Sequence, residues 1–169
     1  MRRRASSECR GLPVSYADFR HRMPLRVRWA EVDKQGVVFN AHYLLYCDVC
    51  VTEYWRAVGL NYPDDFVNQG SDLFVRKSTI EYHWSAYYDD ELEICGRIAR
   101  LGTSSMRFVV EIYRRRQYEA VLVTAELVYV HADPVARQSR LISLDVRDRI
   151  RTFETVMPEE SLEQPLHAS

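Results

Sequence analysis

Two different alternations of apolar and polar residues run along this chain. In the first, apolar side chains recur at helical spacing over positions 43–58 and fill about half of a helix circumference: Tyr43, Leu44, Tyr46, Cys47, Cys50, Val51, Tyr54, Trp55 and Val58. A polar stripe follows i, i+4 spacing on the other side: Asp48, Thr52 and Arg56. The pattern predicts one long helix that is buried on most sides, with Asn40 capping its start and Gly59 ending it.

The second alternation has the two-residue period of β-strands. It predicts strands over Leu25–Trp29, Leu73–Ser85, Glu91–Leu101, Met106–Ile112 and Glu119–His131. Strands this long must belong to a strongly curved sheet, since strands of about five or six residues are usual. We therefore expect an α+β fold in which a long curved antiparallel sheet is wrapped around one central helix. A short amphipathic helix should follow Pro134.

The 169 residues are most simply one domain. We expect a poorly ordered lead-in over residues 1–23, the folded domain over 24–157 and a loose tail over 158–169. The net charge of −1 argues against nucleic acid as a partner. No apolar run approaches the ~20 residues of a membrane span, and none follows the basic start as in a signal peptide.

Cys47 and Cys50 form a CxxC pair, a spacing found in redox and zinc sites. Because the pair lies in the apolar helix without a second CxxC or a nearby His pair, we interpret both as core residues and expect no metal. Unpaired cysteines are typical of a reducing compartment, which favours the cytoplasm.

The loop that precedes the long helix carries the candidate chemistry. Its candidate acid is Asp33, and Gly36 is suited to a turn. A lone Asp in a polar loop is usually a turn residue, yet unpaired amides at a helix start can polarise a substrate oxygen beside it. The rival acid Glu53 lies roughly 15–20 Å along the helix from Asn40, so we expect it in an ion pair. His42 is interpreted as a polar residue of the first helical turn.

The run from Asp33 to Tyr43, DKQGVVFNAHY, resembles the signature of hotdog-fold thioesterases of the 4-hydroxybenzoyl-CoA thioesterase family. It is most similar to the acyl-CoA thioesterases associated with the Tol–Pal system. The similarity continues through Phe74–Lys77, Tyr88–Asp90 and Gly102–Ser104, and covers roughly Pro24 to Asp133. Leu101 departs from the pattern, because close relatives tend to have a basic residue there.

The resemblance implies a hotdog-fold acyl-CoA thioesterase that needs no cofactor. Asp33 would be the base or nucleophile, and the amide of Asn40 would bind the developing oxyanion. Substrate contacts would come from Gly36, Tyr43, Arg76, Lys77, Ser104 and Ser105, although core packing explains Tyr43 equally well. The resemblance also implies an acyl-CoA or acyl carrier protein substrate and self-association into dimers or tetramers.

Two alternatives remain open at this stage. A hotdog enoyl-CoA hydratase or dehydratase would need a catalytic His beside an Asp, in a motif that we do not find. A non-catalytic acyl-CoA-binding regulator would not need Asp33, which is present.

Overall fold

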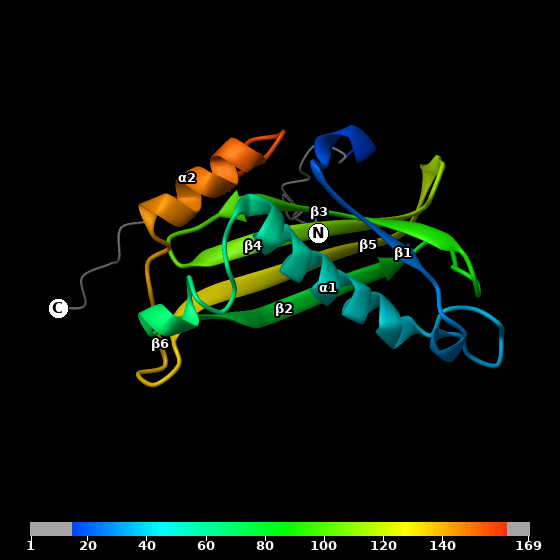
Figure 1. The fold of residues 1–169 in the computed structure, drawn as a ribbon, viewed down its shortest axis with the longest axis horizontal. Coiled ribbons are helices and arrows are strands. Elements are labelled where there is room, and N and C mark those ends of the chain that lie inside the picture. Colours follow the sequence, from blue (N-terminus) through cyan, green and yellow to red (C-terminus); the bar gives the residue numbers. More distant parts are fainter. Residues whose placement is uncertain (1–14, 162–169) are drawn as a thin grey trace, which may run out of the picture.

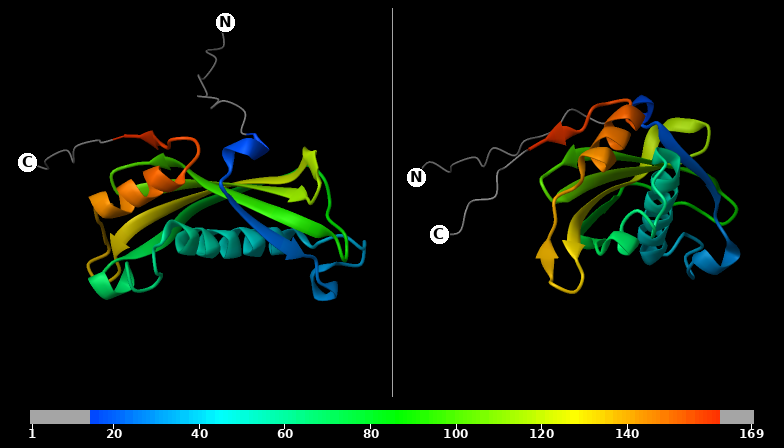
Figure 2. Two further views of the ribbon diagram at one scale, coloured as in Figure 1. Left: turned by 45° about the horizontal axis from the view of Figure 1, so that its top comes forward. Right: turned by 60° about the vertical axis from the view of Figure 1, so that its left-hand side comes forward.

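A long antiparallel sheet curls around the helix α1 in the computed structural model, which describes residues 15–161 (Figures 1 and 2). The five main strands are β1 (His21–Arg26), β2 (Asp72–Tyr82), β3 (Glu91–Leu101), β4 (Ser105–Arg114) and β5 (Gln117–Asp133). They are ordered β1-β3-β4-β5-β2. The helices are α1 (Asn40–Val58) and α2 (Leu144–Phe153), with short 3-10 turns η1 (Tyr16–Asp18), η2 (Trp29–Glu31) and η3 (Val67–Gln69). The predicted hotdog arrangement is confirmed.

The first strand differs from its prediction. β1 spans His21–Arg26, where it pairs with β3, whereas the sequence predicted Leu25–Trp29. Trp29–Glu31 instead form η2, in which the Glu31 carboxylate accepts a hydrogen bond from the Arg28 amide at 2.7 Å. The apolar–basic alternation runs on from β1 to Trp29, the first residue of this turn, so periodicity alone did not reveal where the strand ends.

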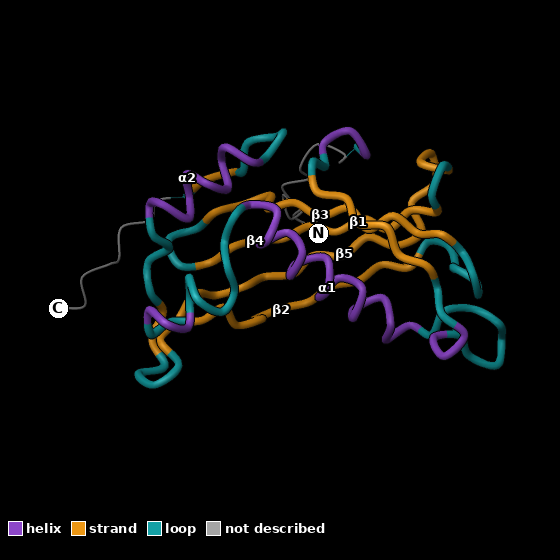
Figure 3. Tube along the Cα trace, viewed as in Figure 1, coloured by secondary structure: helices purple, strands orange, loops and turns teal. Residues whose placement is uncertain are grey.

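The ends of the chain also differ in part. The short strand β7 (Glu159–Glu160), expected in a loose tail, pairs with the end of β3, and β6 (Gln138–Ser139) pairs with β5. Figure 3 shows the loops gathered at the two ends of the sheet. Part of the lead-in expected over residues 1–23 is regular structure, since η1 and the start of β1 lie within it. Its residues 1–14 and the tail after residue 161 lie outside the described residues.

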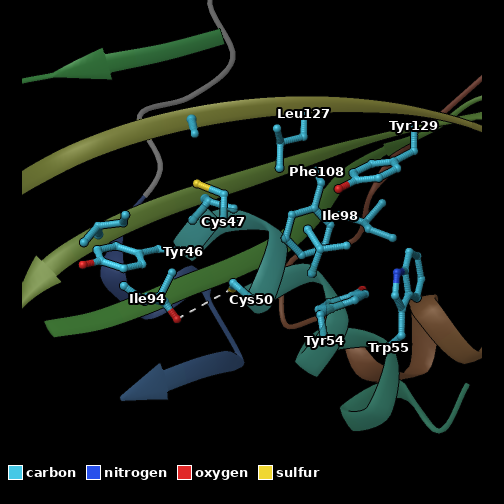
Figure 4. Close-up of a cluster of buried hydrophobic side chains, with 14 of the residues drawn as sticks. Tyr46, Cys47, Cys50, Tyr54, Trp55, Ile94, Ile98, Phe108, Leu127 and Tyr129 are labelled. Carbon is cyan, nitrogen blue, oxygen red and sulfur yellow. Dashed lines mark hydrogen bonds between the residues drawn. The ribbon is translucent and has the colours of Figure 1, made fainter. Parts of the chain in front are cut away.

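The core lies between α1 and the concave face of the sheet (Figure 4). Cys47 and Cys50 are fully buried there, which confirms their interpretation as core residues. Gly96 in β3 allows the close approach, because a Cβ atom there would lie 2.7 Å from the Phe108 ring and 2.8 Å from Cys50 Sγ. Gly59 ends α1 in the left-handed conformation, as predicted, with φ of 82°.

One side of α1 is uncovered in the single chain, contrary to the prediction of a helix buried on most sides. Leu44, Leu45 and Val49 are 42 %, 48 % and 40 % exposed. The edge strand β2 lies next to this surface, and residues 74–79 of it are exposed. An edge strand beside an apolar helix surface is the kind of feature that a second chain covers.

Candidate active site

Asp33 begins a tight hairpin between η2 and α1. The Asp33 amide donates to the Val37 carbonyl at 2.9 Å, and the Gly36 amide donates back to the Asp33 carbonyl at 3.0 Å. Val32 and Val38 form the next rung of the hairpin. Gly36 adopts φ of +76°, in the left-handed region that favours glycine.

The hairpin is fixed on both sides. The Val38 amide donates to the Ala86 carbonyl at 2.9 Å, and Val37 bridges to Tyr87, so the β2–β3 connection holds its outer arm. The Phe39 amide donates to the Glu31 carbonyl at 2.9 Å, which ties the start of α1 to η2. These bonds place Asp33 at the amino-terminal end of α1.

Asn40 is not the helix cap that the sequence predicted. Phe39 occupies the cap position without a side-chain cap, and Asn40 is the first helical residue. The reason is that the Phe39 amide is bound to Glu31, so the chain turns into the helix immediately afterwards. Among the described residues, the amides of Asn40 and Ala41 have no hydrogen-bond partner. They lie at the positive end of the helix dipole.

Only one oxygen of the Asp33 carboxylate is hydrogen-bonded within the loop. Its Oδ1 atom accepts a hydrogen bond from the Gln35 amide at 2.7 Å, which forms a local turn. Within the described part of the chain, Oδ2 accepts none. The side chain is partly exposed, so this oxygen can meet water or a bound molecule.

Tyr43 is a core residue that also supports the loop. It is buried, and its hydroxyl accepts a hydrogen bond from the Ala86 amide at 2.9 Å. Its ring packs edge-on against Tyr82, whose hydroxyl donates to the Asn40 carbonyl at 3.2 Å. Burial raises the pKa of the Tyr43 hydroxyl, so it stays neutral at physiological pH.

An apolar groove of about 440 Å³ runs along α1 beside β2 and β5. We call it the α1 groove; its lining residues are Ala41, Leu44, Leu45, Asp48, Val75, Ser78, Leu127 and Tyr129. It starts one residue after Asn40 and passes along the uncovered side of the helix. A groove of this kind suits an apolar chain or ring.

The remaining expected substrate residues lie elsewhere in the chain. Arg76 stands at a bulge in β2, followed by Lys77, and both are exposed on the sheet edge. Ser104 and Ser105 lie at the β3–β4 turn near α2, at the opposite end of the sheet from the Asp33 hairpin (Figure 1). The single chain therefore places Ser104 and Ser105 away from Asp33, and it holds Arg76 and Lys77 on the edge strand beside the α1 groove.

The structure also settles two minor expectations. Glu53 forms an ion pair with Arg56 one turn along α1, as predicted, and both side chains are largely exposed. His42 lies in the first turn of α1 with its ring edge-on to Phe39.

Residues 15–161 contain no group of three or more His, Cys, Asp or Glu side chains that could hold a metal ion. No helix in that range is long and apolar enough to cross a membrane.

Sequence reasoning missed one buried charge beside the site, Glu31. It is only 3 % exposed, and its carboxylate contacts Arg28 and Tyr46. In the sequence it is simply a polar residue two positions before Asp33. The i, i+3 spacing of Arg28 and Glu31 was the only available signal.

Comparison with known proteins now identifies the family. A sequence model of the Thioesterase superfamily matches residues 35–121. Acyl-CoA thioester hydrolase YbgC of Escherichia coli O157:H7 is 30 % identical over 121 residues, which cover 72 % of this chain and 88 % of the relative. A chloroplastic acyl-acyl carrier protein thioesterase of Arabidopsis thaliana, ATL3, is 30 % identical over 104 residues, or 60 % of this chain and 53 % of the relative.

Solved structures agree with this result. A probable thioesterase from Bartonella henselae has a TM-score of 0.65 and 26 % identity, and the match covers 73 % of this chain and 98 % of that one. A 1,4-dihydroxy-2-naphthoyl-CoA thioesterase from Synechocystis has a TM-score of 0.70 at 18 % identity, over 77 % of this chain and 94 % of that one. The second match supports the fold alone. The chain belongs to the Thioesterase superfamily and is a thioester hydrolase.

Proposed function

We propose that this chain hydrolyses acyl-CoA thioesters to a carboxylic acid and free CoA, with the Asp33 carboxylate and the first amides of α1 as its catalytic groups. The observation that carries the proposal is the Asp33 hairpin, whose bonds to Ala86 and Glu31 fix it beside a helix start with free amides. The E. coli relative's name, acyl-CoA thioester hydrolase, supports CoA as the carrier.

The chemistry follows one of two routes. In the first, Asp33 takes a proton from water, the resulting hydroxide attacks the thioester carbon, and the C–S bond breaks to release the thiolate. In the second, an Asp33 oxygen attacks the carbon itself, the thiolate leaves, and water then opens the mixed anhydride. On both routes the carbonyl oxygen becomes negative, and we assign its stabilisation to the amides of Asn40 and Ala41.

The α1 groove is the proposed site of the acyl group. It starts at Ala41, whose amide is one of the two proposed oxyanion donors, and reaches Asp48. The seven residue steps from Ala41 to Asp48 span roughly 10 Å at about 1.5 Å per residue. This length suits a short or medium acyl chain, or a single aromatic ring, better than a long fatty chain.

A second copy of the chain is proposed to complete the site. The exposed strand β2 and the uncovered side of α1 both favour association. If two copies pair through β2 about a two-fold axis, their strands run antiparallel. The partner's β2 then lies alongside this chain's β2, so a second Arg76 and Lys77 stand on the edge beside the α1 groove as candidate contacts for the CoA phosphates.

The carrier, the compartment, the family branch and the type of reaction also belong to this proposal. The Arabidopsis relative's name makes acyl carrier protein the alternative carrier. The three described cysteines are free and buried, which favours a reducing compartment such as the cytoplasm. The resemblance to the Tol–Pal-associated branch rests on the sequence motif. The match to a thioesterase family favours hydrolysis over the hydratase and regulator alternatives.

The test is thiol release from acetyl-, hexanoyl-, palmitoyl- and benzoyl-CoA and from a matching acyl carrier protein thioester. We expect turnover of at least one CoA ester of short or medium chain, with the acyl carrier protein ester slower. Turnover of the carrier protein ester alone would assign that carrier instead. Absence of hydrolysis across the whole panel would contradict the proposed function.

A further inference from the structure

Glu31 is a buried carboxylate two residues before Asp33 that the proposed chemistry does not use. Its Oε2 atom accepts hydrogen bonds from the Arg28 amide at 2.7 Å and from the Tyr46 hydroxyl at 2.8 Å. Its Oε1 atom accepts from Arg28 Nε at 2.8 Å, and the two side chains form an ion pair. Each carboxylate oxygen therefore has two donors, so the side chain is held rigidly.

These contacts join two segments that meet at the site, η2 with its cap residue and α1. Arg28 precedes η2, Tyr46 lies in the second turn of α1, and Glu31 itself ends η2. The Glu31 carbonyl meanwhile accepts the Phe39 amide at 2.9 Å, immediately before Asn40. Glu31 thus bonds to α1 through its side chain and to the residue that precedes α1 through its main-chain carbonyl.

We propose that Glu31 is a positioning residue, which sets the Asp33 carboxylate against the first amides of α1 through its bond to Tyr46. The proposal rests on the proposed function. Asp33 lies in the hairpin that follows Glu31 and Asn40 begins α1, and Glu31 bonds to α1 through the Tyr46 hydroxyl and to the helix entry through the Phe39 amide. A shift of about 1 Å between two groups that act on one carbonyl can lower a rate about a hundredfold.

The same helix offers a matched control. Tyr54 lies eight residues after Tyr46, and its hydroxyl donates to a second buried carboxylate, Glu154, at 2.6 Å. Tyr46→Phe and Tyr54→Phe therefore remove the same kind of bond from the same helix. The two bonds lie at opposite ends of it, and only the Tyr46 bond adjoins the Asp33 hairpin.

The experiment measures kcat, KM and the thermal midpoint of both variants, with the acyl-CoA that the wild type hydrolyses fastest. We expect both to lower the thermal midpoint. Well below that midpoint, Tyr46→Phe should lower kcat roughly ten- to a hundredfold with KM changed less than about threefold. Tyr54→Phe should keep the wild-type kcat. Glu31→Gln, which replaces an acceptor oxygen by a donor, should lower kcat at least as far as Tyr46→Phe.

Two results would overturn the proposal: a wild-type kcat in Tyr46→Phe, or an equal loss of kcat in Tyr54→Phe. If Glu31→Gln fails to fold, the tyrosine pair still decides. Asp33→Asn in the same assay separates the two levels of inference. If Asp33→Asn is inactive and Tyr46→Phe is fully active, only the positioning role of Glu31 is contradicted. If Asp33→Asn is fully active, the proposed active site itself is contradicted.

Discussion

The Tyr54 hydroxyl lies 2.6 Å from Glu154 Oε1 and joins the carboxy-terminal part of α1 to the residue that follows α2. The same oxygen accepts the Ile98 amide from β3 at 2.7 Å. Glu154 Oε2, in contrast, is buried with no hydrogen-bond partner among residues 15–161. Burial raises the pKa of Glu154, against the opposing effects of Tyr54, Ile98 and Arg97. The carboxyl therefore binds its proton more tightly in the folded than in the unfolded chain.

Replacement of Glu154 by Gln should remove the pH-dependent loss of folding stability that the buried carboxyl causes. As pH rises above the unfolded value of about 4.3, the raised pKa means that the folded chain binds more protons than the unfolded chain, so stability falls until the folded carboxyl ionises. Gln keeps the acceptor oxygen for Tyr54 and Ile98 and removes the charge. Urea unfolding should find Glu154→Gln as stable as the wild type near pH 4 and equally or more stable near pH 7.5, by up to about 1 kcal/mol. A variant clearly less stable at the higher pH would contradict this reading.

Glu31 should show the opposite pH dependence. Burial alone would raise its pKa, but the hydrogen bonds from Arg28 and Tyr46 outweigh burial and lower it. A lowered pKa stabilises the fold above the unfolded value of about 4.3, and this contribution is lost as pH falls through the folded value. Glu31→Gln should thus cost roughly 1–3 kcal/mol near pH 7 and progressively less in acid. Urea unfolding of both proteins at several pH values measures this loss of stability. A loss that is the same at every pH would be inconsistent with an ionised Glu31.

Gly96→Ala should destabilise the core without touching the candidate site. The new methyl group would lie 2.7 Å from the Phe108 ring and 2.8 Å from Cys50 Sγ, both of which are packed in the core. Overpacking of this kind costs roughly 1–3 kcal/mol. Denaturant unfolding should show this loss, and the double variant Gly96→Ala/Cys50→Ala should recover part of it relative to the sum of the two single changes. If the losses of stability of the two single variants simply add in the double variant, then α1 moves away from the sheet without cost and the new methyl group does not clash with Cys50.

Association through β2 can be tested by a charge on the sheet edge. Phe74 is a partly exposed apolar residue in this edge strand, and Phe74→Glu should shift the sedimentation coefficient towards the monomer. Val135→Glu is the matched control, because Val135 is 92 % exposed in the turn that follows β5. It should leave the sedimentation coefficient unchanged. A well-folded wild-type monomer at micromolar concentration would rule out the proposed pairing.

The sequence predicted those features that depend on local periodicity. The bounds of β3 and the left-handed Gly59 matched, because a two-residue alternation and a lone glycine after an apolar helix each have one simple explanation. Buried carboxylates were not predictable in this way. Tyr54 and Glu154 are 100 positions apart, and only the fold brings them together. The cap at Asn40 was wrong because the bond between the Phe39 amide and Glu31 is equally invisible in the sequence.

The catalytic role of Asp33 remains a prediction, and Asp33→Asn tests it. The Asn Oδ1 atom can keep the 2.7 Å bond from the Gln35 amide, so the hairpin and the proposed pairing of two chains should survive. The amide neither takes a proton from water nor forms an anhydride, so hydrolysis should fall roughly a hundred- to ten-thousandfold. Glu53→Gln is the control, since it removes a carboxylate from an exposed ion pair on α1 and should leave turnover unchanged.

The two routes can be separated in the wild-type enzyme by a single turnover in ¹⁸O-labelled water. Direct attack by water puts the label in the product acid. Attack by Asp33 forms an anhydride, and water that opens it at the Asp carbonyl leaves the label in the side chain, where mass spectrometry of the peptide containing Asp33 detects it. If Asp33→Asn hydrolyses every acyl-CoA at the wild-type rate, neither route applies and the catalytic carboxylate must be sought elsewhere. Glu53 is then the first candidate, because the sequence offers it on α1 as the rival acid to Asp33.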